Sequence, residues 1–128
     1  MIRKRLSFVK NYETFVKVLT DHGLASLGDA YINFAFSLAV SEKSGKPSGA
    51  KVKGSLLAQA FRKAGLREYM PSRVSRHSLA DAAEAMIVYA WLCGYISLEE
   101  SISILVDNED AVEGLSQLLT TIKERIKF

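Results

Sequence analysis

Three carboxylates stand in stretches that are otherwise rich in apolar residues, and their types and spacing suit a divalent cation. Asp29 interrupts the run SLGDAYINFAF at residues 26–36, and Asp81 and Glu84 lie in a later apolar run. Residues three apart on a helix share a face, with Cβ atoms roughly 5 to 6 Å apart. An unpaired ionised carboxylate among apolar neighbours lowers the stability of the fold by roughly several kcal/mol unless a metal or a cationic partner compensates for its charge. We therefore treat Asp29, Asp81 and Glu84 as candidate metal ligands.

Each acid also has a structural explanation that the sequence leaves open. Asp81 follows Ser78 at the spacing of a capping box, which would place it in the first turn of a helix. Asp29 and Glu84 could each pair with a Lys or Arg of another helix. No persuasive Ser-His or Cys-His pair offers a nucleophile instead.

The two histidines and the single cysteine do not form a second site. His22 and His77 are too isolated for a zinc site without further ligands. We assign both to loops, with His77 a candidate phosphate contact. Cys93 alone excludes an intramolecular disulfide. Since no apolar leader precedes the basic N-terminus, the sequence predicts a reducing, cytoplasmic setting.

The elements that position the acids are predicted to be helices. Apolar residues recur at three- and four-residue spacings and rarely alternate, which predicts an all-α, single-domain helical bundle over residues 1–128. Ser78 and Ser97 each begin a capping-box spacing. Apolar runs are broken well before the roughly 20 residues of a membrane span, so we expect a soluble protein without a membrane partner. The expected helices cover about 12–19, 24–42, 50–64, 78–94, a fifth from 97, and a sixth from after 108 to the C-terminus.

Positive charge is concentrated in one part of the chain. Residues 43–77 hold nine Lys or Arg against one acid, whereas residues 81–128 hold nine acids against three Lys or Arg. The first twelve residues add Arg3, Lys4, Arg5 and Lys10 without an acid. Such asymmetry indicates a polyanionic partner, although solvation of helix surfaces explains it as well. The candidate nucleic-acid contacts are Lys43, Lys46, Lys51, Lys53, Arg73 and Arg76.

The acidic segments resemble the ribonuclease III catalytic domain family. Leu27-Gly28-Asp29-Ala30 is similar to the family's signature helix, and Leu79-Ala80-Asp81-Ala82-Ala83-Glu84-Ala85 is similar to its second acidic motif. The resemblance covers about residues 10–126. It implies a homodimeric, Mg²⁺-dependent endonuclease for double-stranded RNA, with Mn²⁺ a possible substitute. Asp29 and Glu84 would then be the principal catalytic metal ligands and Asp81 a supporting one.

The chain departs from the family pattern in two places. Ala25 stands where the family usually has a glutamate, one helical turn before Asp29, so three carboxylates are present in place of four. Leu24-Ala25 resembles the compact mini-ribonuclease III branch, which consists of the catalytic domain alone. Ser26 replaces the aromatic residue that usually helps to dock the partner subunit. No double-stranded RNA-binding domain is expected, so the basic segments would hold the RNA.

Two other functions compete with the nuclease. The first is a catalytically weak or inert RNA-binding dimer module on the same fold, which the loss of an acid at Ala25 favours. The second is a helical nucleotide pyrophosphohydrolase, another all-α Mg²⁺ enzyme. That class requires Glu-x-x-Glu paired with Glu-x-x-Asp, and the acids that come nearest to this spacing lie around residues 100–113, where helix capping explains them.

Overall fold

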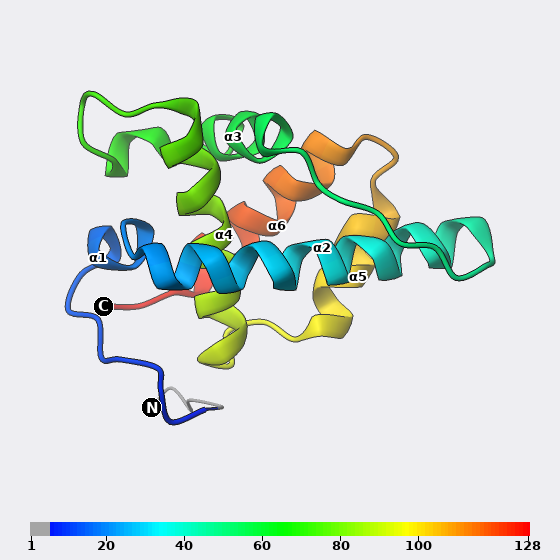
Figure 1. Cartoon of the computed structure of the whole chain (residues 1–128), viewed down its shortest axis with the longest axis horizontal. Coiled ribbons are helices and arrows are strands. Elements are labelled where there is room, and N and C mark those ends of the chain that lie inside the picture. The colour runs from blue at the N-terminus through cyan, green and yellow to red at the C-terminus, as the bar shows by residue number, and fades with distance from the viewer. Residues whose placement is uncertain (1–5) are drawn as a thin grey trace.

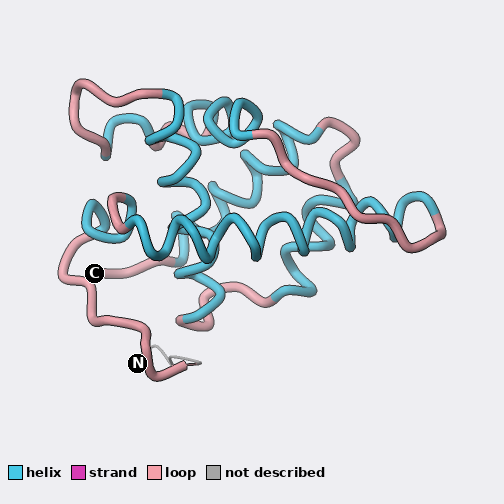
Figure 2. The backbone as a smooth tube through the Cα atoms, viewed as in Figure 1, coloured by secondary structure: helices cyan, strands magenta, loops and turns pink. Residues whose placement is uncertain are grey.

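A computed structural model describes residues 6–128, and within that range the chain is helical and has no strand (Figures 1 and 2). The all-α prediction is therefore confirmed. The helices are α1 (Phe15–Leu19), α2 (His22–Ser44), α3 (Gly54–Lys63), the short 3₁₀ helix η1 (Arg67–Tyr69), α4 (Arg76–Leu92), α5 (Leu98–Asp107) and α6 (Ala111–Arg125).

The two central helices, α2 and α4, cross each other and carry all three candidate acids. With 23 residues, α2 runs for about 34 Å across the molecule (Figure 1). Every residue of α4 from Leu79 to Leu92 is buried except Asp81 and Trp91. A helix buried on nearly all sides shows little amphipathic periodicity, because it packs against α2, α3, α1 and α6 at once.

The start of α4 differs from the prediction. Ser75 is its N-cap, and the Ser75 Oγ accepts a hydrogen bond from the Ser78 backbone N–H at 3.2 Å. The predicted capping box of Ser78 and Asp81 is wrong, because the helix begins two residues before Ser78. Asp81 thus lies in the second turn, where no capping role explains it. The third helix also begins later than predicted, at Gly54.

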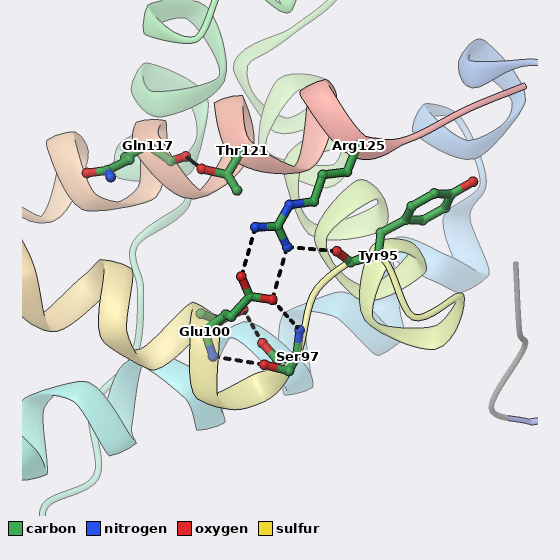
Figure 3. A network of polar contacts seen from close by, with 7 residues as sticks. Tyr95, Ser97, Glu100, Gln117, Thr121 and Arg125 are labelled. Carbon is green, nitrogen blue, oxygen red and sulfur yellow. Dashed lines mark hydrogen bonds and ion pairs between the residues drawn. The ribbon is translucent and has the colours of Figure 1, made fainter.

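The predicted capping box at Ser97 is confirmed, and it belongs to a polar network that joins α5 to α6 (Figure 3). The Arg125 guanidinium donates to both carboxylate oxygens of Glu100, at 3.0 and 2.8 Å, and to the Tyr95 carbonyl at 3.0 Å. Glu100 is also the acid of the capping box. One carboxylate therefore orders the start of α5 and the end of α6.

Among residues 6–128, α2 is the one helix that is long and apolar enough to cross a membrane by length and composition. Its middle carries Asp29 and Asn33, and it packs against α4 and α5. These are the features of a central helix in a folded domain. Several of its apolar side chains stay uncovered, however: Leu27 is 39% exposed and Phe34 is 56% exposed.

Candidate active site

The three predicted acids line one open pocket of about 410 Å³ where α2 crosses α4. Asp29 is the eighth residue of α2, at the start of its third turn, and Asp81 and Glu84 come from successive turns of α4. Asp29 and Asp81 are partly exposed, whereas Glu84 is only 7% exposed. Residues separated by 52 positions or more in the chain are thus brought to one place, as the sequence predicted.

Gly28 allows the two helices to approach each other at this point. A Cβ atom on Gly28 would lie 2.1 Å from the Glu84 carbonyl oxygen and 2.5 Å from its carbonyl carbon. No side chain fits at such distances, so only glycine permits the crossing. Because Asp29 is the next residue, the close approach places its carboxylate beside that of Glu84.

Glu84 is a buried acid in contact with another acid. Burial, a side-chain hydrogen bond with Asp29, and the negative charges of Asp29 and Asp81 together raise the pKa of Glu84 to about 8, against a smaller opposing effect of Lys51. Among residues 6–128, neither Glu84 nor Asp29 forms an ion pair with a Lys or Arg. The structural explanation left open by the sequence, an ion pair with another helix, thus finds no support in the described part of the chain.

Asn33 holds Asp29 in place, a role that the sequence did not reveal. One helical turn after Asp29, its Nδ2 donates to the Asp29 Oδ1 at 3.1 Å. Its Oδ1 accepts a hydrogen bond from the Val52 backbone N–H at 2.8 Å. Asn33 therefore ties the acid to the segment that leads into α3 and carries Lys51.

Both histidines lie at this pocket, which corrects their predicted assignment to loops. His22 is the first residue of α2 and His77 the second residue of α4, and both line the pocket with the acids. Lys51 and Ala25 line it as well. The start of α2 and the start of α4 meet here, so residues that look isolated in the sequence share one site. The pocket therefore combines three acids with the exposed side chains of Lys51, His22 and His77.

The candidate RNA contacts fall into two groups. Lys51 lines the pocket, Lys53 is the N-cap of α3, and Arg73 and Arg76 lie before and at the start of α4. Lys43 and Lys46 lie at the other end of α2, about 21 Å from Asp29 along the helix. All six are exposed, and Lys43 also donates to the Asn108 carbonyl at 2.6 Å. Of the basic N-terminal residues, 3–5 lie outside the described range.

The comparison with protein families identifies this region of the chain. The family model of ribonuclease III matches residues 22–127, from the first residue of α2 to two residues beyond the end of α6. The chain belongs to the ribonuclease III family. No curated protein matched it in a separate search. The matched region contains every acid of the site, so the two acidic motifs that resembled this family are part of the family domain.

Membership in the ribonuclease III family implies a divalent cation, and the side chains of this site fit one. Mg²⁺ prefers oxygen ligands and is often held by only one or two carboxylates, with waters and substrate phosphates completing its shell. Asp29 and Glu84 supply two such carboxylates in contact, and no Lys or Arg among residues 6–128 forms an ion pair with either of them. Within the same range, no three His, Cys, Asp or Glu side chains form a complete protein-only metal site. The donors therefore suit a cation that is partly held by its substrate.

Proposed function

We propose that this ribonuclease III family member is a divalent-metal-dependent endoribonuclease that hydrolyses phosphodiester bonds in double-stranded RNA. The observation that carries the proposal is the buried contact between Asp29 and Glu84, which opens into a pocket with a basic rim. Two acids brought together without a basic partner are costly for a merely structural site. They are what a phosphodiester hydrolase needs to hold a cation against its substrate.

The side chains of the pocket have distinct parts in this proposal. Asp29 and Glu84 would hold Mg²⁺, or Mn²⁺ in its place, and Asp81 would support them through charge. When bound, such an ion supplies an activated water and neutralises charge on the phosphate. Asn33 orients Asp29, and burial keeps Glu84 away from competing water. Lys51 and His77 stand at the rim, where a phosphate would approach the acids.

Recognition of the RNA would rest on phosphates and duplex shape. Duplex RNA is read mainly through its backbone, its 2′-hydroxyls and its A-form geometry. Lys51 lines the pocket, Lys53 and Arg76 are each next in sequence to a lining residue, and Arg73 lies just before α4. Lys43 and Lys46 extend the exposed basic residues to the far end of α2. The segment of residues 45–53 runs back along α2 and links the two groups (Figure 1). Binding by such contacts should weaken steeply with salt.

The proposed enzyme is a homodimer built on the uncovered face of α2. Leu27, Ala30 and Phe34 are exposed at spacings of three and four residues, which places them on one side of the helix. Tyr31 lies beside them and packs on Trp91, with ring centroids 5.3 Å apart. A continuous apolar helix face is suited to a second copy of the same face. Phe34→Lys should convert a dimer into a monomer in light scattering, whereas a monomeric native protein would refute this part.

Within the family we place the protein with the compact mini-ribonuclease III type, because Ala25 occupies the position of the usual glutamate. A cytoplasmic location is a separate proposal, which rests on the single cysteine of the sequence. Ala25 is 6% exposed and lines the pocket, so the position does face the site. The same residue supports the second candidate function, an RNA-binding dimer with weak or no catalysis. The nuclease and the RNA-binding dimer differ in whether Asp29, Asp81 and Glu84 are sufficient for catalysis without a fourth acid. The family match gives no support to a pyrophosphohydrolase.

Cleavage of a labelled RNA duplex decides between them. The native protein should cut it with Mg²⁺ and not with EDTA, and Glu84→Gln should lower the rate by at least about 100-fold, because one ligand of the cation is lost. The matched control is Glu99→Gln, since Glu99 is exposed in the first turn of α5, away from the pocket. Duplex binding without metal-dependent cutting would establish the inert module, and neither binding nor cutting would refute both.

A further inference from the structure

A second cavity adjoins the candidate active site and has a mixed lining of four apolar side chains and five polar ones, the latter being Thr20, Asp21, His22, Ser78 and Asp81. Its volume is about 160 Å³, and Leu19, Met70, Pro71 and Val74 contribute to its walls. The lining residues come from the junction of α1 and α2, from the segment between η1 and α4, and from the start of α4. Figure 1 shows the first two segments at the same end of the molecule. His22 and Asp81 line both this cavity and the active-site pocket. The cavity is therefore the immediate neighbour of the proposed reaction centre.

The walls of this cavity are fixed without a ligand. The Arg67 guanidinium donates to the Pro71 carbonyl at 3.0 Å and to the Ser72 carbonyl at 2.8 Å. Met70 is 8% exposed and anchors the same segment in the core. On the opposite side, Asp21 caps α2 and accepts a hydrogen bond from the Tyr12 hydroxyl at 2.5 Å. A preformed cavity binds without the cost of ordering its walls.

The size and lining of the cavity limit what it can bind. An apolar cavity of about 150 Å³ in another protein holds a benzene molecule, so this one has room for a single flat ring and is too small for a base pair. The four apolar side chains suit the faces of such a ring, and the polar side chains suit the donors and acceptors on the edge of a nucleobase. Of these polar side chains, His22 and Asp81 also line the active-site pocket. Arg73 and Arg76, exposed on either side of Val74, attract a phosphate backbone to the opening.

We propose that this cavity binds one unpaired nucleobase of pyrimidine size in the RNA strand, next to the phosphate that is cut. The inference rests on the proposed function, because it takes RNA to be the substrate. A base inside a duplex must be extruded at a cost, and this cost is least where the base is already unpaired. A bulged nucleotide is therefore the natural occupant, and the cavity gives the protein a preference for imperfect duplexes.

The binding of RNA duplexes in EDTA, which prevents their cleavage, tests the proposed base-binding cavity with two readouts. Fluorescence anisotropy compares three duplexes: fully paired, with one bulged 5-fluorouridine, and with one bulged abasic residue. The fluorine NMR signal reports whether the bulged base enters a protein environment. The bulged uridine should bind about tenfold tighter than the other two, near the lower end of what one stacked base contributes, and its fluorine signal should shift. Val74→Phe fills the cavity and should abolish both effects.

The matched control is Val106→Phe, because Val106 is also partly buried but lies on α5, at the far end of α2. It should retain the preference for the bulged base. Equal affinity for all three duplexes, with no shift of the fluorine signal, would overturn this inference and leave the proposed function intact. Failure to bind any duplex would overturn both. The abasic duplex needs no protein variant, so it decides the matter even if Val74→Phe does not fold.

Discussion

Replacement of Gly28 by alanine tests whether the crossing of α2 and α4 is as close as described. The new Cβ atom would lie 2.1 Å from a backbone carbonyl oxygen of α4, and backbone cannot rotate away as a flexible side chain can. Overpacking of this kind costs about 3 kcal/mol at the upper end of the usual range. Alanine recovers about 1 kcal/mol through its higher helix propensity. The free energy of unfolding should thus fall by about 2 kcal/mol.

Thermal unfolding followed by circular dichroism measures this effect. For a chain of this length, a loss of about 2 kcal/mol lowers Tm by roughly 8 °C. Gly54→Ala is the matched control, because its Cβ would meet only the Ala80 Cβ at an ordinary 3.8 Å. The Tm of that variant should stay the same or rise. If Gly28→Ala is as stable as the native protein, the close crossing is refuted.

Cleavage activity should respond to Gly28→Ala more strongly than stability does. The clash falls on the backbone of Glu84, so relief of the clash moves this carboxylate away from Asp29. A displacement of roughly 1 Å in a catalytic group costs about 100-fold in rate. Assays below the Tm of the variant separate this loss from unfolding. A loss of cleavage activity that only matches the unfolded fraction of the variant would be explained by unfolding alone. A folded variant with full activity would show that the Asp29–Glu84 distance is not critical.

Three further predictions follow from the polar contacts. Ser75→Ala should lower the free energy of unfolding by about 1 kcal/mol in urea titrations, while Ser78→Ala should change it little, because Ser75 is the N-cap of α4; the reverse order would restore the predicted capping box. Asn33→Ala should lower the cleavage rate more than stability, because both of its side-chain bonds orient the site, and equal losses would make Asn33 merely structural. Without metal, Tm should fall as pH rises from about 5 to 8, because over this range the folded protein keeps the Glu84 proton up to a pKa of about 8, whereas the unfolded chain has lost it near 4.5. Glu84→Gln should remove that slope, and an unchanged slope would assign it to other groups.

The sequence predicted the helices that have a distinct signal of their own. Ser97 and Glu100 form the expected capping box, since only one pair of residues at that point has the required spacing. At α4, the prediction rested on Ser78 alone, because the acid at position 81 gives Ser78 the spacing of a capping box. The structure selects Ser75, since Asp81 serves the pocket instead of the helix terminus. Local spacing alone could not separate these two uses of one acid.

The acids of the site could be predicted, but the residues that position them could not. Asp29 and Glu84 are conspicuous because charge is rare in an apolar run, and this signal needs no knowledge of the fold. Asn33 is an ordinary polar residue until Val52 is placed beside it, a contact between residues 19 positions apart. His22 likewise acquires a site only when the starts of two helices meet. Roles that depend on contacts across the fold have no local signature.

The adjacency of Gly28 and Asp29 explains why the site lies where the helices are closest. Close packing excludes water and raises the cost of an ionised carboxylate, which is visible in the raised pKa of Glu84. The same exclusion of water strengthens the attraction between the two acids and a cation placed between them. By bringing the backbones together, Gly28 thus makes the ionised pair of acids unfavourable without a cation and favourable with a cation between them. The packing of α2 on α4 and the affinity of the site for a cation are therefore coupled, so a variant that loosens one should weaken the other.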